Sequence, residues 1–371
     1  MSASIEAPQT TAGTGRRQGA PDERIRVAVV GATGYAGAEL VRILARHPAV
    51  ELVGLGGRGR IAEPVETVHP HLATTGLAID EAVPEADAVF LALPHGIAVG
   101  QVPAIVESGA TVIDIGPDFR LRDPADYPRW YRFEHGRPDL LAQAVYGLPE
   151  LHRAELVALS GQAVRIVGSP GCFATAAILA LAPLARAGLL GDVVVDAKSG
   201  VSGAGRDTKP ESMFSEVNES VRAYGIGGHR HVAEIEQELA VAGAGTGTDN
   251  PGARGLDFLP HLIPMTRGIL AAAHVRPTRP VNQAELDALF AQAYGDEPFV
   301  SVVAEPPATK HVMGSNEARL HVTYDERTGR ILVLAVIDNL VKGAAGQAIQ
   351  AFNLVHGLAE TTGLEQLPLA P

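Results

Sequence analysis

In the first part of the chain, segments with the apolar pattern of a strand alternate with segments whose apolar residues have helical spacing. Residues 25–30, IRVAVV, form a Val-rich apolar run that leads into glycine, which is typical of a strand buried on both faces of a parallel sheet. Residues 36–48 carry apolar side chains at helical spacing as far as a proline, and residues 50–57 return to strand character. These segments predict a β-α-β unit.

The same alternation continues to residue 170, and the pattern then changes. A helix-like run at 172–188 is followed by longer strand-like runs, which predict a second, largely antiparallel sheet. We therefore expect an α/β chain with a Rossmann-type doubly wound parallel sheet in residues 24–170, and an α+β catalytic and oligomerisation domain in residues 171–342. The helical end, residues 343–371, is expected to pack back on the first domain. The strand-like runs of the second sheet are 193–201, 256–265, 268–277, 301–307, 318–325 and 331–339.

Composition narrows the class of protein. The chain has 371 residues, of which 46% are hydrophobic, which favours two folded domains over one core. A formal net charge of −12 offers no broad basic field for nucleic acid. The single cysteine excludes an internal disulfide and a multi-cysteine metal site, and it favours a reducing compartment such as the cytoplasm.

Two further features concern location. No apolar run approaches the roughly 20 residues needed to span a bilayer, so we expect no membrane association. Residues 1–23 are rich in Ser, Thr, Ala, Gly and Pro and lack the apolar core of a secretion signal, so we expect a flexible tail. The segment 243–255 is rich in Gly, Asn and Pro and is expected to be a surface loop.

The glycine motif GATGYAG follows the first predicted strand and opens the first predicted helix. In that context Gly31, Gly34 and Gly37 allow the backbone, with Thr33 and Tyr35 beside it, to approach a pyrophosphate. The acidic residue that NAD-preferring enzymes place about 20 residues on is missing. Arg58 and Arg60 stand at the end of the second strand instead, which favours NADP. The structural alternatives are a tight turn and a solvated basic loop.

A nucleophile and its proton acceptor form the second candidate group. Cys172 follows Ser-Pro-Gly and opens a helix, where the helix dipole favours a thiolate. His229 and His231 stand at the entrance to another helix, and the spacing alone does not choose between them. A small buried side chain is the structural alternative for Cys172. Zinc bound by the histidines with Glu234 and Glu236 was weighed, but HExxH spacing is missing and no metal is expected.

Anion-holding residues are predicted in two further places. Residues 198–206, KSGVSGAGR, combine hydroxyls and glycines with two cations, a composition suited to holding phosphate. The structural alternative is a glycine-rich corner of a sheet, which has the same composition. Arg120 is suited to holding a carboxylate or phosphate, or to capping a surface turn. The sequence leaves open whether Arg120, Lys198 or Arg206 holds the anion.

The motifs GATGYAGAEL, FLALPHG, DFRL, YGLPEL, GSPGCFATA, SGVSGAGR, GHRHVAEI, GSN and IDNLVKGAAGQAIQAFN occur in this order from residue 24 to residue 371. In their residues and their order, these motifs resemble those of the N-acetyl-γ-glutamyl-phosphate reductase family (type 1) of the semialdehyde dehydrogenase superfamily. The resemblance implies an NADP(H)-dependent reduction of N-acetyl-L-glutamyl 5-phosphate to the semialdehyde and phosphate, in arginine biosynthesis. It also implies a homodimer or homotetramer.

The resemblance further implies roles for individual residues. Cys172 would displace phosphate to form a thioester that NADPH reduces, and His229, the first histidine of HRH, would serve as acid/base. The remaining implied residues divide between cofactor and substrate. For the cofactor they are Gly31, Thr33, Gly34, Tyr35, Gly37, Arg58, Pro94, His95, Asn339 and Gly343, and for the substrate Arg120, Ser199, Ser202, Gly203 and His231.

The choice of substrate stays open within this resemblance. Residues 135–153 and 64–72 look like the branch that reduces acyl phosphates on an amino-group carrier protein, namely L-2-aminoadipyl 6-phosphate in lysine biosynthesis or L-glutamyl 5-phosphate. Residues 206–231 look like the arginine branch, which places the free acetylated substrate first. Rivals from other classes are a cysteine hydrolase and a redox-sensing binding module; the first gives no reason for the glycine motif and the second does not need Cys172.

Overall fold

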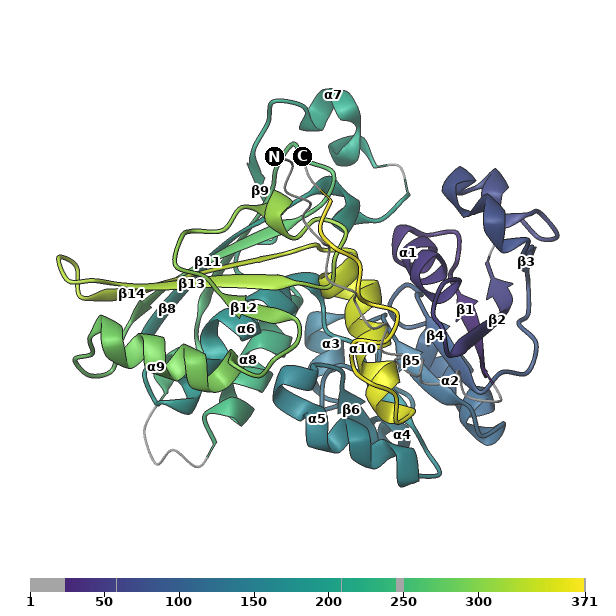
Figure 1. Ribbon diagram of the computed structural model, residues 1–371, viewed down its shortest axis with the longest axis horizontal. Coiled ribbons are helices and arrows are strands. Elements are labelled where there is room, and N and C mark those ends of the chain that lie inside the picture. The colour runs from purple at the N-terminus through teal and green to yellow at the C-terminus, as the bar shows by residue number, and fades with distance from the viewer. Residues whose placement is uncertain (1–23, 58, 208, 245–249, 370–371) are drawn as a thin grey trace, which may run out of the picture.

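Two seven-stranded sheets organise the part of the chain that the structure, a computed structural model, describes (Figure 1). That part comprises residues 24–57, 59–207, 209–244 and 250–369. The tail predicted for residues 1–23, and Arg58, lie outside the described residues. The sheets correspond to the predicted α/β class with a second α+β unit, and this prediction is confirmed.

The first sheet has the strand order β3-β2-β1-β4-β5-β7-β6, and all its pairings are parallel. Val27, Ala28 and Val29 of β1 are fully buried, because helices cover both faces of the sheet and exclude water from both sets of alternating side chains. Its strands are β1 (Ile25–Val30), β2 (Val50–Gly56), β3 (Ile79–Asp80), β4 (Ala88–Leu91), β5 (Thr111–Asp114), β6 (Ala144–Tyr146) and β7 (Ile166–Gly168), and its helices α1 (Tyr35–Leu44), α2 (Ala98–Glu107), α3 (Asp126–Trp130), α4 (Pro138–Leu141) and α5 (Pro149–Ala158).

The second sheet has the order β12-β13-β14-β11-β8-β10-β9. It is largely antiparallel, with parallel pairings of β8 with β10 and of β12 with β13. Buried and half-exposed positions alternate along β8 and β11, because α6 covers one face. The elements are β8 (Asp192–Ser199), β9 (Arg222–Ala223), β10 (Asp257–Leu262), β11 (Ile269–Arg276), β12 (Val300–Val302), β13 (Ala318–Asp325), β14 (Arg330–Ile337), α6 (Cys172–Arg186), α7 (Phe214–Val217), α8 (His231–Ala242) and α9 (Gln283–Tyr294).

The chain returns to the first sheet at its C-terminal end. After β14 comes a π-helical turn, Val341–Ala345, which leads directly into α10 (Gly346–Val355). Figure 1 shows α10, in yellow, between the two sheets. The ring of Phe352 packs against that of Phe90 in β4, with centroids 5.5 Å apart, so α10 shares the hydrophobic core of the nucleotide sheet.

Residues 245–249 of the loop expected at 243–255 lie outside the described residues, and in the rest Pro251, Arg254 and Gly255 are exposed. Residues 250–255 contain a 3-10 turn, Pro251–Arg254, in which Gly252 and Ala253 are buried. Gly252 lies so close to β8 and its preceding turn that an added Cβ would come within 2.5 Å of Val193. A small residue is therefore needed at Gly252, because the backbone packs against the sheet there.

Candidate functional site

The glycine turn between β1 and α1 has the geometry that a dinucleotide requires. Gly31 has φ +94°, and a Cβ added there would lie 2.2 Å from the carbonyl oxygen of Ala92. A Cβ on Gly37 would lie 2.2 Å from the carbonyl oxygen of Gly31. Gly34 is the N-cap of α1 and brings no side chain to the helix start, so a ligand phosphate can approach the first N–H groups.

A cavity of about 570 Å³ adjoins this turn and opens between the two domains. Tyr35 lines it from the nucleotide domain, while Ser202, Arg206 and Leu340 line it from the second domain. Its volume and its arginine suit a bound nucleotide phosphate. The residues of this structure therefore fit a dinucleotide cofactor held between the glycine turn and the second domain.

Asn339 connects several of the residues that were predicted separately. Its Oδ1 accepts a hydrogen bond from the Gly268 N–H at 2.7 Å, and its Nδ2 donates to Ser202 Oγ at 2.9 Å. Gly203 lies beside both Ser199 and Asn339, because an added Cβ would be 3.1 Å from Ser199 Oγ and 3.8 Å from Asn339 Nδ2. The structure thus brings Ser199, Ser202, Gly203 and Asn339 together at one wall of the site.

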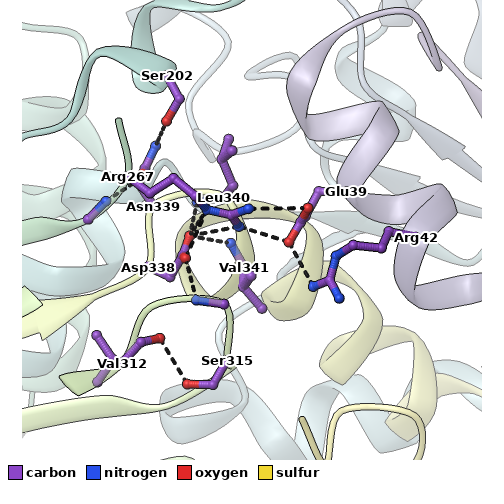
Figure 2. Close-up of polar contacts among 12 residues, drawn as sticks. Glu39, Arg42, Ser202, Arg267, Val312, Ser315, Asp338, Asn339, Leu340 and Val341 are labelled. Atoms are coloured by element: carbon purple, nitrogen blue, oxygen red, sulfur yellow. Dashed lines mark hydrogen bonds and ion pairs between the residues drawn. The ribbon is translucent and has the colours of Figure 1, made fainter. Parts of the chain in front are cut away.

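A buried ion-pair network behind this wall joins the two domains (Figure 2). Arg267 donates to Asp338 at 3.0 Å and to Glu39 of α1 at 2.8 Å. Burial alone would raise the pKa of Glu39, but the hydrogen bonds from Arg42 and Arg267 hold it below its usual range. Asp338 also accepts from the Gly314 N–H at 2.7 Å, so the residue preceding Asn339 is fixed from several sides.

Cys172 is the first residue of α6, with Gly171 as N-cap, and it is half-buried. Burial raises the pKa of its thiol to about 11, against the opposing effects of the Arg120 charge and the Phe173 N–H. The helix start favours a thiolate, whereas loss of solvation opposes it, and the net result is a raised thiol pKa. The sulfur is a neutral thiol near pH 7 and needs a proton acceptor before it can attack.

His229 and His231 supply two neutral imidazoles beside the cysteine turn. Their ring centroids lie 4.7 Å apart, and a Cβ added to Gly171 would come within 2.3 Å of His231 Nε2. Burial lowers the pKa of His229 to about 4, helped by Arg230, and it lowers the pKa of His231 well below its usual value. The His231 N–H donates to His229 Nδ1 at 3.2 Å, so neutral His229 carries its proton on Nε2.

Glu234 and Arg120 hold the turn that carries Cys172. Glu234 is fully buried and accepts hydrogen bonds from the Gly171 N–H at 2.9 Å and from Arg120 Nη1 at 3.2 Å. Arg120 also donates to the carbonyl oxygen of Ser169 at 2.7 Å and to that of Ile115 at 2.6 Å. Substrate binding by Arg120 stays a prediction; in this structure its guanidinium supports the Ser-Pro-Gly turn.

The loop at Pro94 and His95 approaches the histidines from the nucleotide domain. Asp118 accepts from the Gly96 N–H at 2.7 Å and thereby anchors this loop. Arg230 donates to His95 Nδ1 at 3.2 Å, which joins the loop to the HRH segment. Two segments that are far apart in the sequence and were predicted for cofactor and catalysis are therefore neighbours.

Two further residues that the sequence singled out, Gly343 and Lys198, lie in different parts of the structure. Gly343 packs directly on the nucleophile, since an added Cβ would lie 2.7 Å from Cys172 Cβ. Lys198 pairs with Asp196 at 2.7 Å. The sequence analysis did not predict the ion-pair network of Glu39, Arg267 and Asp338. Charged side chains inside apolar segments were the feature that could have indicated it.

The described residues also limit which other kinds of site the protein can contain. Among them, no group of three or more His, Cys, Asp or Glu side chains is placed to hold a metal ion. No helix in the same ranges is both long and apolar enough to cross a membrane.

Comparison with known proteins matches both halves of the chain. Residues 26–159 match the family described as semialdehyde dehydrogenase, NAD binding domain, and residues 172–339 match semialdehyde dehydrogenase, dimerisation domain. The fold agrees with that of aspartate semialdehyde dehydrogenase II from Vibrio cholerae, with a TM-score of 0.66 at 17% identity over 91% of this chain and 99% of that one. The fold and the site thus define a protein of the semialdehyde dehydrogenase class.

Relatives at higher identity narrow the class. A protein of Heliobacterium modesticaldum named N-acetyl-gamma-glutamyl-phosphate reductase is 48% identical over 94% of this chain and 100% of its own length. Another of that name from Symbiobacterium thermophilum is 49% identical over 92% of this chain and 97% of its length. The chain belongs to the N-acetyl-γ-glutamyl-phosphate reductase family, as its motifs predicted.

Proposed function

We propose that this protein reduces N-acetyl-L-glutamyl 5-phosphate to N-acetyl-L-glutamate 5-semialdehyde and phosphate with NADPH, in arginine biosynthesis. The observation that carries the proposal is the position of Cys172. It opens α6 beside two neutral imidazoles and contacts Gly343, which lies shortly after Asn339 in the sequence. Asn339 in turn bonds Ser202 in the wall of the cavity that adjoins the glycine turn.

The first chemical step forms a thioester on Cys172. His229 is assigned as the base: its Nδ1 releases the hydrogen bond from the His231 N–H and accepts the thiol proton while Sγ attacks the acyl carbon. The bond between that carbon and the phosphate oxygen breaks, and phosphate leaves. Because the thiol has a raised pKa and His229 a lowered one, proton transfer between them is unfavourable in the free enzyme.

The second step releases the aldehyde. When bound, NADPH supplies the hydride that reduces the thioester carbon. The carbon–sulfur bond then breaks, and His229 returns its proton to the sulfur of Cys172. Pro94 and His95, together with Asn339 and Gly343, would hold the nicotinamide end of the cofactor, and Gly31, Thr33, Gly34, Tyr35 and Gly37 would hold the pyrophosphate.

Cofactor and substrate preference follow from the same residues. The preference for NADP is assigned to Arg58, which follows the second strand in the sequence, because the sequence lacks the acidic residue of NAD-preferring enzymes there. The names of the relatives support the free acetylated acyl phosphate ahead of a carrier-bound one. We retain Ser199, Ser202, Gly203 and His231 as substrate contacts.

Assembly and location are part of the proposal. One face of the second sheet is half-exposed along β11 and β14, where Leu270, Leu332 and Leu334 point away from α6. A second copy covering this face would bury these leucines, and the matching dimerisation-domain family supports a homo-oligomer. The single cysteine, which forms no disulfide, is consistent with a cytoplasmic enzyme.

The test runs the reaction in reverse. The purified protein should form NADPH, followed by its near-ultraviolet absorbance, from NADP and the semialdehyde only when inorganic phosphate is present. Phosphate-independent hydrolysis of acyl esters without any NADPH signal would support the cysteine hydrolase instead. Comparing rates with free and carrier-linked acyl phosphate then decides the substrate.

A further inference from the structure

The turn that contacts Cys172 has an unusual backbone. Residues Val341–Ala345 form a π-helix, with the Gly343 N–H bonded to the Asp338 carbonyl and the Ala345 N–H bonded to the Leu340 carbonyl, both at 2.9 Å. Such wide turns are rare and are often found at functional sites. Here the turn presents the bare Cα of Gly343 to Cys172, with no room for a side chain.

Lys342 lies in the middle of this turn and is completely buried. Its Nζ donates to Glu150 Oε1 in α5 and to Gln350 Oε1 in α10, each at 2.6 Å. Burial would raise the pKa of Glu150, but the Lys342 charge holds it below its usual range. The ion pair lies inside the protein and crosses from the C-terminal turn to the nucleotide domain.

A buried ion pair is a poor source of net stability, because desolvation of both ions offsets their attraction. In some proteins such a pair instead selects one arrangement among several that pack equally well. Lys342 immediately precedes the glycine that touches the nucleophile, so a shift of the lysine moves Gly343. The mechanism described above makes no use of Lys342, Glu150 or Gln350.

We propose that Lys342 is a positioning residue: its buried pair with Glu150 holds the π-turn so that Gly343 fixes Cys172 for attack on the acyl carbon. The inference rests on the proposed role of Cys172 as nucleophile. It adds a determinant that lies outside the substrate and cofactor sites and acts only through the backbone of the turn.

The test removes both charges at once with Lys342→Met and Glu150→Gln, so that no unpaired ion is left buried. Reaction geometry that is looser by about 1 Å costs up to about 10²-fold in rate, so kcat should fall by that order while KM changes little.

Alkylation by iodoacetamide, without substrate or cofactor, reports on the only thiol in the chain. Its pH midpoint should move down from about 11 toward the ordinary value of about 8.5 as water reaches the sulfur.

Two further variants make the result decisive. Arg279→Met with Glu285→Gln is the matched control, because it also removes both charges of an ion pair, at the start of α9 and away from the turn. It should leave the kcat and the alkylation midpoint at wild-type values. Gly343→Ala keeps the ion pair but pushes a methyl group onto Cys172, and it should lower kcat even if the double variant does not fold.

The outcomes separate the inference from the proposed function. A folded Lys342→Met, Glu150→Gln variant with the kcat and alkylation midpoint of the Arg279→Met, Glu285→Gln control would overturn the inference, and so would a Gly343→Ala enzyme of full activity. Wild-type protein without phosphate-dependent NADPH formation would overturn the proposed function. In that case the alkylation midpoints would still show whether Lys342 positions the cysteine.

Discussion

Glu234→Gln offers a sharp test of how the cysteine turn is held. Glu234 is fully buried and accepts from the Gly171 N–H, Arg120, and the hydroxyls of Tyr131 at 3.3 Å and Tyr146 at 3.1 Å. The amide keeps an acceptor but loses the charge opposite Arg120, and it turns an N–H₂ group toward donors. Breaking a buried ion pair on one side costs about 3–5 kcal/mol.

We expect the free energy of unfolding to fall by that amount, measured by urea denaturation followed by circular dichroism. We also expect a lower kcat, because the affected N–H belongs to the residue before Cys172. Glu236→Gln on the same helix is the matched control, since its half-exposed carboxylate lies outside this network and its loss should cost within about 0.5 kcal/mol. Equal urea midpoints and equal kcat for the two variants would refute the reasoning.

Three further predictions concern the nucleophile, the base and the cofactor turn. Iodoacetamide alkylation of Cys172 in the free enzyme should still accelerate at pH 10, because burial raises the thiol pKa to about 11; a plateau by pH 8 would contradict this. His229→Asn should lower kcat by about 10²–10⁴-fold, and the acid limb of wild-type kcat/KM should fall near pH 4, below which the base is protonated; a larger loss with His231→Asn would move the role. Gly31→Ala should weaken NADPH binding measured by fluorescence titration, since its Cβ would overlap Ala92; unchanged affinity would count against the cofactor site.

The features that were predictable from sequence are those with local causes. The first β-α-β unit can be recognised from the sequence because three features follow one another within about thirty residues: a strand buried on both faces, a glycine turn and an amphipathic helix. Cys172 at the start of α6 is visible for the same reason, since Ser-Pro-Gly breaks the preceding strand. The family motifs then supply roles that spacing alone does not.

The features that were missed depend on contacts across the fold. Arg267 meets Glu39 and Asp338 only after the two domains have packed together, and no periodicity encodes that meeting. The raised pKa of Cys172 was not predictable from the local sequence, because the burial that opposes the helix dipole comes from the whole assembled site. The π-turn was not predicted because the sequence pattern of residues 341–345 is that of the start of an ordinary α-helix.

Release of phosphate in the absence of NADPH tests the central claim most directly. Mixed with N-acetylglutamyl phosphate alone, the wild-type protein should release one equivalent of phosphate per subunit in a rapid burst and retain the acyl group on Cys172, located by peptide mass spectrometry. Cys172→Ala should release none above the spontaneous rate. A burst of equal size from that variant would show that the thioester is not formed at this sulfur.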